Sequence, residues 1–309
     1  YAFAKTDKEF TALLDHPNPK VQTLVAARLG TKSTIEETRT ENLMKVADRG
    51  ALPIMLNYYG AHTGRFSGGD KLNLQNLPRN GAIRKAITVP KGHSLIACDS
   101  SQIEARMVAY IAGQDDLVQA FREGRDVYSE FATEVYGKKV TKDDKIQRFV
   151  GKTCILGLGY GMGHVKFRAT LALGQGGIAV DIDENEAKRI VNLYRQKNHK
   201  IVSLWHSCGH ALNGMVSGAS GNICELLPYD KDGITLPNGL KIKYNALRNT
   251  ADGFEYISDA RTFRKLTQKR LMTGEQQKID WTRIYGGKVT ENVVPVSYTH
   301  LRAHETVVH

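Results

Sequence analysis

The chain has 309 residues, of which 41% are hydrophobic, and its formal net charge is +11. This size and composition are ordinary for a soluble globular protein with one sizeable core or two modest domains. No stretch approaches the roughly 18–20 apolar residues of a membrane span, so no membrane partner is expected. The four cysteines form no C-x-x-C pair, which argues against a zinc site and favours a reducing compartment. The basic charge favours a polyanionic partner such as nucleic acid.

The first 50 residues are predicted to be helical. One helix is expected to end at Gly30, and another to begin after a cap at Ser33 or Thr34. Residues 58–78 then lack periodicity and are typical of loops and turns. Several planar hydrogen-bonding side chains in this segment suit base edges and phosphates, although by themselves they fit a solvated loop better. They are Arg65, Asn73, Gln75 and Asn76.

The stretch around Asp99 organises the rest of the chain. Residues 94–98 form a short apolar run that is predicted to be a buried strand, and helical spacing begins at Ser101. Asp99, at the end of this strand, suits a ligand for a hard cation. The alternative is that Asp99 or Ser100 only caps the helix, with Ser101 and Glu104 forming a capping box.

Two further helices are predicted downstream. Val127–Tyr136 forms the first, and the second begins at a capping box, Thr141–Asp144. If the second helix continues past Gly157 and Gly159, one of its faces carries Arg148, Lys152, Leu156 and Tyr160. Two cations and an aromatic ring in a row suit a triphosphate and a stacked base, although isolated pairs of cations are more often solvated. The sequence contains neither a P-loop nor a dinucleotide-binding glycine motif.

The remaining chain is expected to contain two helices, a hairpin and a final helix. The two helices lie between residues 181 and 215, and the hairpin covers residues 233–244 with an Asn-Gly turn. The final helix is expected to begin at Trp281. His206 and His210 have the spacing of a metal pair but no third ligand nearby, so we interpret both as structural.

Three of these segments resemble a family A DNA polymerase, the bacterial DNA polymerase I and phage kind. Asp99-Ser-Ser-Gln-Ile-Glu-Ala-Arg106 resembles its motif A, and the segment Arg148–Gly161 resembles its motif B. Thr63-Gly-Arg65 and residues 73–78 resemble the upstream segment that touches primer and template. The three segments occur in family order over roughly residues 20–294, with the closest likeness to phage enzymes.

The resemblance implies an α+β fold of the right-hand polymerase type, with an antiparallel palm sheet and largely helical fingers. It divides the chain into entry helices of the thumb and palm at 1–50, palm with motif A at 51–115, fingers with motif B at 116–220, a palm return at 221–294 and a non-native tail at 295–309. The implied activity is template-directed transfer of a nucleotide from a dNTP to a primer 3′-hydroxyl. The implied partners are primer–template DNA and a dNTP, in the cytoplasm of a bacterial host.

The resemblance also assigns roles at motif A. Asp99 and the carbonyl group of Ser100 would hold two Mg²⁺ ions together with a second carboxylate. Gln102 and Glu104 would bind the nucleotide, and Glu104 would be the steric gate that excludes a ribose 2′-hydroxyl. The upstream residues would contact primer–template DNA: Arg65, Asn73, Gln75 and Asn76.

Motif B and its neighbours would bind the rest of the nucleotide. Arg148 and Lys152 would hold the triphosphate, and Lys152 would also be a catalytic general acid for pyrophosphate. Tyr160 would stack near the template base. Tyr128 stands where many relatives have a phosphate-contacting histidine, and Leu156 replaces an aromatic residue, so both are candidates for nucleotide binding.

One family motif is missing from the sequence. Motif C, a His-Asp-Glu that carries the second metal carboxylate, does not follow Val294, and the tail beyond it has no family likeness. We therefore expect a polymerase fragment that binds DNA but does not add nucleotides at a useful rate. The alternative is a non-catalytic module that binds primer–template or single-stranded DNA.

Overall fold

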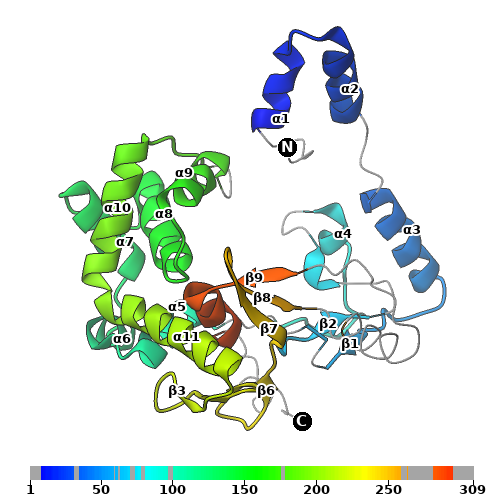
Figure 1. Cartoon of the computed structure of the whole chain (residues 1–309). Coiled ribbons are helices and arrows are strands. Elements are labelled where there is room, and N and C mark those ends of the chain that lie inside the picture. The colour runs from blue at the N-terminus through cyan, green and yellow to red at the C-terminus, as the bar shows by residue number, and fades with distance from the viewer. Residues whose placement is uncertain are drawn as a thin grey trace. The chain divides into compact units, whose positions relative to one another are not determined.

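The computed structural model describes residues 8–30, 35–58, 60–61, 63–69, 74–77, 81–96, 100–174, 178–258, 263 and 281–294 (Figure 1). The chain divides into two compact units. Unit 1 comprises Tyr1–Asn57 and Gly68–Leu95, and unit 2 comprises Tyr58–Ser67 and Ile96–His309. Helices and antiparallel sheets occur together, which confirms the predicted α+β class. No helix in the described part of the chain is both long and apolar enough to cross a membrane.

Unit 1 consists mainly of short helices. They are α1 (Lys8–Ala12), the 3₁₀ turn η1 (Leu13–Asp15), α2 (Pro19–Gly30), α3 (Ile35–Ala47), the 3₁₀ turn η2 (Leu74–Asn76) and α4 (Ala82–Lys85). Helix α2 begins at a proline, which needs no main-chain hydrogen bond in the first turn, and it ends at the predicted Gly30. The predicted caps Ser33 and Thr34 lie outside the described residues. Strands β1 (Leu56–Asn57) and β2 (Ser67–Gly68) form a two-stranded sheet.

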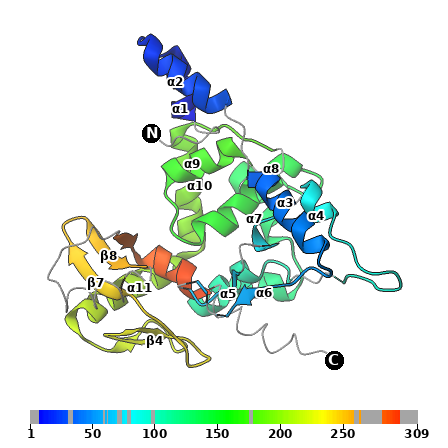
Figure 2. The same cartoon turned by 90° about the vertical axis from the view of Figure 1, so that its right-hand side faces the viewer.

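Unit 2 contains the larger set of helices. They are α5 (Ile103–Ala112), α6 (Asp115–Arg122), α7 (Val127–Tyr136), α8 (Lys145–Thr153), the π-helical segment η3 (Cys154–Leu158), α9 (His164–Leu173), α10 (Glu184–Lys197) and α11 (His199–Ser217), followed by a helix over residues 286–294. Helix α7 has the predicted bounds. Figures 1 and 2 show α11 running from the helices of this unit to its strands, and α11 contacts α5 and α10 as well as β3, β4 and β7.

Two antiparallel sheets complete unit 2. The first has the order β3 (Gly221–Asn222), β4 (Pro228–Asp230), β5 (Gly233–Thr235) and β6 (Lys241–Ile242), and the second has the order β7 (Asn245–Thr250), β8 (Gly253–Ile257) and β9 (Thr282–Ile284). Strands β5 and β6 pair with Ile234 opposite Ile242, which confirms the predicted hairpin. The prediction of a helix from Trp281 was wrong at its start, because residues 282–284 pair with β8 and the helix begins at residue 286.

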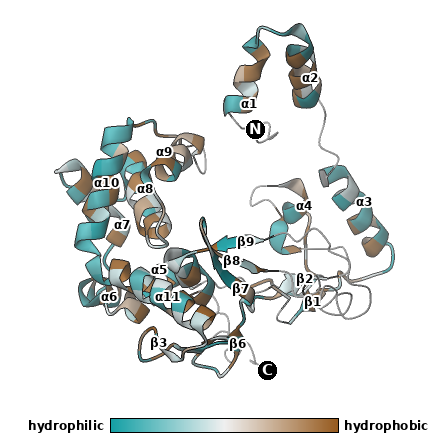
Figure 3. Ribbon diagram, viewed as in Figure 1, coloured by the Kyte–Doolittle hydropathy of each residue, from teal (hydrophilic) through white to brown (hydrophobic). Residues whose placement is uncertain are grey.

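The core of unit 2 forms where its helices meet. Helix α10 buries Ala187, Ile190, Val191 and Tyr194, which recur at the spacing of one helical face. Figure 3 shows the corresponding mixture of hydrophilic and hydrophobic residues along α10. Tyr194 packs edge-on against Phe131 of α7, with ring centroids 5.6 Å apart. The amphipathic pattern of the sequence therefore determines which face of α10 points inward.

The prediction of a strand over residues 94–98 was wrong for the residues of this segment that the structure describes. Residues 94–96 have no regular secondary structure, and the side chains of Leu95 and Ile96 are 71% and 88% exposed. Residues 97–99 lie outside the described part of the chain. An apolar run becomes a strand only where a neighbouring strand accepts its main-chain hydrogen bonds, and none of the described strands pairs with residues 94–96.

Helices α7 and α8 approach each other closely at Gly151. A Cβ atom at this position would overlap the main-chain carbonyl oxygen of Tyr128 and press on the side chain of Ala132. Because both neighbours belong to the packed face of α7, neither can move without shifting the helix. Glycine at position 151 therefore sets the separation of the two helices.

We expect Gly151→Ala to lower the free energy of unfolding by about 1–3 kcal/mol, because overpacking forces the backbone to shift. Gly209→Ala in α11 is the matched control, since an added Cβ there would have nothing within 4 Å. Gly209→Ala should be more stable than the unaltered chain by roughly 0.5–1 kcal/mol, because alanine is more favourable than glycine in a helix interior. Urea unfolding followed by circular dichroism measures both, and equal stability of the two variants would contradict the packing argument.

Candidate functional site

The start of α5 differs from a simple capped helix. Its N-cap is Gln102, which has a left-handed backbone (φ 57°) and makes no side-chain capping hydrogen bond. Neither the predicted cap at Ser100 nor the capping box of Ser101 and Glu104 is therefore formed. A left-handed conformation at a residue with a long side chain costs free energy and is concentrated at functional sites.

Glu104 uses its carboxylate for an ion pair instead of a cap. The Arg65 Nη2 atom lies 3.3 Å from the Glu104 Oε1 atom, and about half of each side chain is exposed. Both residues belong to unit 2, although they are far apart in the sequence. The pair brings the upstream segment that carries Arg65 to the first turn of α5.

Arg148 is held by a carboxylate that the sequence analysis did not single out. The Arg148 Nε–H donates to Asp126 Oδ2 at 2.7 Å, and Nη2 donates to Asp126 Oδ1 at 3.2 Å. The Ser129 hydroxyl donates to the same Oδ2 atom at 2.8 Å. Burial alone would raise the pKa of the Asp126 carboxyl, but the hydrogen bonds from Arg148 and Ser129 hold that pKa below its ordinary value. Asp126 is therefore ionised at neutral pH.

Tyr128 connects this pair to α5. Its ring lies under the Arg148 guanidinium, with the Cζ atom 5.4 Å from the ring centroid, and the Gln102 side chain lies near its phenol. Burial raises the pKa of the Tyr128 phenol, and the carboxylates of Asp126 and Glu104 add to this effect. Tyr128 thus joins the predicted nucleotide-binding residues of both motifs in one cluster.

The continuous α-helix that would give motif B a single face is interrupted in the structure. Helix α8 begins at Lys145, later than predicted, and its N-cap Asp144 makes no side-chain capping hydrogen bond. The Asp144 carboxylate accepts hydrogen bonds from the Thr141 N–H and hydroxyl, so only one half of the predicted capping box is formed. Helix α8 continues only to Thr153, where the π-helical segment Cys154–Leu158 takes over. A π-turn inserts an extra residue into each hydrogen-bonded ring, so the regular spacing of an α-helix does not continue beyond Thr153.

The π-helical segment divides the predicted row into two parts. Arg148 and Lys152 lie on α8, Leu156 lies within the segment, and Tyr160 follows it. The Lys152 side chain is partly exposed and forms no ion pair with any other residue that the structure describes. Arg148 is thus anchored by a carboxylate, and Lys152 remains available to an anionic ligand.

Tyr160 has a hydroxyl group buried without a partner. Within the described structure, its Oη atom is inaccessible and makes no hydrogen bond. Burial raises the pKa of the Tyr160 phenol, and the nearby Glu104 and Glu291 carboxylates raise it further while Arg65 opposes them. The ring therefore lies near the Arg65–Glu104 pair and stays protonated at neutral pH.

The remaining predicted site residues are described only in part, and two of those described belong to unit 1. Asp99 and Asn73 lie outside the described residues, and Ser100 is partly exposed just before α5. Gln75 and Asn76 are exposed in η2 of unit 1, where the Asn76 carbonyl accepts a hydrogen bond from Arg39 at 3.3 Å.

A metal site cannot be assembled from the described side chains. Within the described ranges, no three His, Cys, Asp or Glu side chains gather as ligands. The predicted ligand Asp99 belongs to the undescribed residues 97–99. The described residues therefore define no coordination geometry for Mg²⁺.

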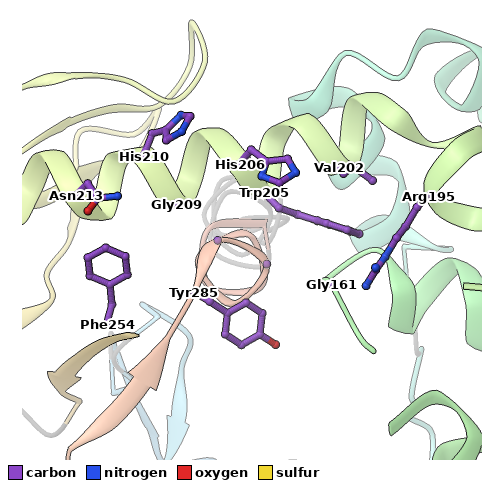
Figure 4. A pocket seen from close by; sticks show the side chains of 12 residues that line it. Gly161, Arg195, Val202, Trp205, His206, Gly209, His210, Asn213, Phe254 and Tyr285 are labelled. Atoms are coloured by element: carbon purple, nitrogen blue, oxygen red, sulfur yellow. The ribbon is translucent and has the colours of Figure 1, made fainter. Parts of the chain in front are cut away.

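A cleft of about 490 Å³ opens beside Gly161, immediately after Tyr160. Figure 4 shows the Arg195 side chain extending toward Gly161 and Trp205 projecting from α11 toward the same loop. Trp205 is fixed there because its Nε1–H donates to the Gly159 carbonyl at 2.9 Å. Tyr285 lies on the opposite wall, and none of the described residues that line the cleft is acidic.

The cleft depends on two glycines at the start of the helix over residues 286–294. A Cβ atom at Gly286 would overlap the Trp205 carbonyl oxygen, and one at Gly287 would overlap the Tyr160 carbonyl oxygen. His206 and His210, which we interpreted as structural, have exposed side chains and line the cleft. Only the folding of the chain brings these segments together, so no spacing of residues in the sequence predicts the cleft.

Most of the chain matches the model of a known protein family. The model of DNA polymerase family A matches residues 2–215. Among curated proteins, the thermostable DNA polymerase I of Thermus aquaticus is 33% identical over 156 residues, which are 49% of this chain and 18% of that protein. DNA polymerase I of Pseudomonas aeruginosa is 38% identical over 136 residues, which are 42% of this chain and 15% of that protein.

The chain spans less than a fifth of the length of these two curated relatives. A solved structure of similar fold is the POL domain of Pol1 from M. smegmatis in complex with DNA primer-template and dNTP. The match has a TM-score of 0.52 and 20% identity, and it covers 98% of this chain and 44% of that one. At this identity the likeness establishes the fold alone.

We expect Tyr160→Phe to raise the free energy of unfolding by about 1 kcal/mol, because it removes a buried hydroxyl that has no partner. Tyr244→Phe is the matched comparison, since the Tyr244 hydroxyl accepts a hydrogen bond from buried Asn292 at 3.4 Å. That variant should be less stable by about 0.5–1.5 kcal/mol. Thermal unfolding of both distinguishes the two cases, and a loss of stability in Tyr160→Phe would reveal a partner for its hydroxyl.

Proposed function

Because this chain belongs to DNA polymerase family A, we propose that it binds primer–template DNA and a deoxynucleoside triphosphate for template-directed DNA synthesis. The observation that carries the proposal is that Tyr128 lies under Arg148 of motif B and near Gln102 of motif A, which supports a single site for both motif segments. The likeness to phage enzymes remains a prediction, since the named relatives are bacterial.

The triphosphate would bind at the exposed side of α8. Arg148 and Lys152 lie one turn apart there, and a guanidinium and an ammonium suit phosphate oxygens. The Tyr128 hydroxyl offers one further hydrogen bond to a phosphate. The proposed work of this surface is to hold the triphosphate in line with the primer end, since positioning and charge stabilisation dominate phosphoryl transfer.

Glu104 would select the sugar. Its carboxylate lies at the first turn of α5 near the Tyr160 ring, where an added ribose hydroxyl would meet a buried wall. In the absence of substrate Glu104 pairs with Arg65, so a primer end that attracts Arg65 would leave the carboxylate free to face the sugar.

The two-metal mechanism is part of this proposal through the resemblance alone. Mg²⁺ would supply charge stabilisation for the attacking and leaving oxygens, with Asp99 and the Ser100 carbonyl among its ligands. The described residues do not support a metal site by their geometry, so the chemistry assigned to this chain's own residues is binding and orientation.

The cleft beside Gly161 would hold an unpaired template nucleotide. Aromatic rings that stack on bases, together with cations that follow the backbone, are the recognition elements of single-stranded nucleic acid. Trp205, Tyr285 and Arg195 supply these elements in a cleft whose described lining has no carboxylate to repel phosphate. Gly161, which lines the cleft, directly follows Tyr160 of the proposed nucleotide site.

Template direction can be tested by binding alone. With Mg²⁺ and a primer–template, the dNTP complementary to the next template base should stabilise the protein–DNA complex more than the other three. The matching ribonucleotide should be much weaker, because a pocket that rejects an added hydroxyl discriminates by about 100-fold. Glu104→Ala should reduce that difference, as measured by fluorescence anisotropy of labelled DNA during nucleotide titration.

The same titration contains the contrary outcomes. Equal stabilisation by all four dNTPs would overturn template-directed binding and favour a non-catalytic DNA-binding module. If Glu104→Ala still discriminates between the dNTP and the ribonucleotide, Glu104 is not the steric gate, but the polymerase proposal stands. Glu130→Gln is the control, since Glu130 is partly exposed and pairs with Arg125.

The cleft predicts a dependence on the template overhang. Arg195→Ala and Tyr285→Ala should each weaken binding of a primer–template with a 5′ overhang by roughly tenfold, because one stacked base contributes about 1–3 kcal/mol. Binding of blunt duplex by the same variants should stay unchanged. Both affinities are compared at matched salt, since phosphate contacts make affinity depend steeply on ionic strength. An equal loss for the two DNAs would assign these residues to duplex binding.

A further inference from the structure

The strongest unassigned feature of unit 2 is the carboxylate behind Arg148. We propose that Asp126 is a positioning residue, which fixes the Arg148 guanidinium so that its outer edge faces the triphosphate. This inference rests on the proposed function, because it names the group that prepares the triphosphate-binding arginine. Asp126 itself would not touch the nucleotide.

The hydrogen bonds define which donors Arg148 retains. A guanidinium has five N–H donors, and Asp126 takes the Nε–H and one Nη2–H through two separate oxygens. The second Nη2–H and both Nη1–H donors remain available to phosphate. Because the guanidinium is planar, two bonds to Asp126 also fix the direction of this outer edge.

Asp126 is itself held in place. It precedes α7, and its Oδ2 atom accepts a hydrogen bond from the hydroxyl of Ser129, whose side chain is buried. The Asp126 side chain is 15% exposed and that of Arg148 is 31% exposed, so the carboxylate forms the inner side of the pair. Tyr128 and the close approach at Gly151 fix the two helices that carry the pair.

Neighbouring charges do not offer the same support. Glu123 and Glu130 both lie against Arg125, at 2.9 and 3.3 Å. Lys152 has no ion pair with another described residue. A long side chain that is already ordered loses less conformational freedom on binding. Arg148 would therefore bind phosphate as a prepared group, and Asp126 provides that preparation.

The test uses the complete 309-residue chain and inorganic tripolyphosphate as the probe, because this probe isolates phosphate binding from base and sugar. We expect Asp126→Asn to weaken tripolyphosphate binding roughly tenfold in isothermal titration calorimetry, as the loss of a charge-assisted hydrogen bond implies. Asparagine keeps the size and the helix-capping preference of aspartate, so the fold should survive. Glu130→Gln, which removes a carboxylate on the same helix, should bind as the unaltered chain does.

A double-mutant cycle separates positioning from a structural role. If Asp126 acts through Arg148, adding Asp126→Asn to Arg148→Ala should cause no further loss of affinity. Ser129→Ala is a milder variant that removes one hydrogen bond to Asp126, and its loss of affinity should likewise disappear in the Arg148→Ala background. Melting temperatures of all variants show whether each remains folded.

Four results would overturn the inference. Tighter binding by Asp126→Asn would mean that the carboxylate mainly repels phosphate. An equal effect of Asp126→Asn with and without Arg148 would make its role general and independent of the arginine. If Arg148→Ala itself leaves affinity unchanged, the triphosphate site of the proposed function fails first, and this inference fails with it. A loss in Arg148→Ala without one in Asp126→Asn sinks the inference alone.

Discussion

Helices α7 and α8 lie so close together that any side chain at position 151 would overlap the main chain of Tyr128. This contact determines where the charged residues of the site lie. It brings Arg148 over the Tyr128 ring and against Asp126, and it places Lys152 on the adjacent turn. Tyr128 also lies near Gln102, at the start of α5. Close packing transmits such constraints because a dense interior leaves little room for adjustment.

The chain is strongly basic, yet two of the cations predicted to bind substrate already have carboxylate partners. Arg65 pairs with Glu104, and Arg148 pairs with Asp126. The two pairs differ in exposure, since the first is half exposed and the second is largely shielded. An exposed pair contributes little and can exchange its partner at low cost, whereas a shielded bidentate pair holds its geometry. The structure thus combines one cation that can be released with one that is fixed.

Much of what the sequence predicts is confirmed, because the signals involved act between residues that are close together in the chain. Amphipathic spacing and terminal residues determined helices such as α7 and the end of α2 at Gly30, because those signals act within a few residues. The motif segments likewise indicated the family that the later comparison supports. The α+β class was implied by the resemblance to that family, and the Asn-Gly turn between alternating residues predicted one hairpin by itself.

Tertiary structure decided what depends on distant partners. The apolar run before Asp99 has no strand over residues 94–96, because strand formation requires a neighbour that no local pattern guarantees. A π-helical segment interrupts the predicted helix before Tyr160, since the helix type depends on the packing around Cys154–Leu158. Asp126 and the cleft beside Gly161 were invisible in the sequence because their partners come from other elements. Residue types and spacing therefore determined the chemistry available to this chain, and long-range packing decided which of those groups meet.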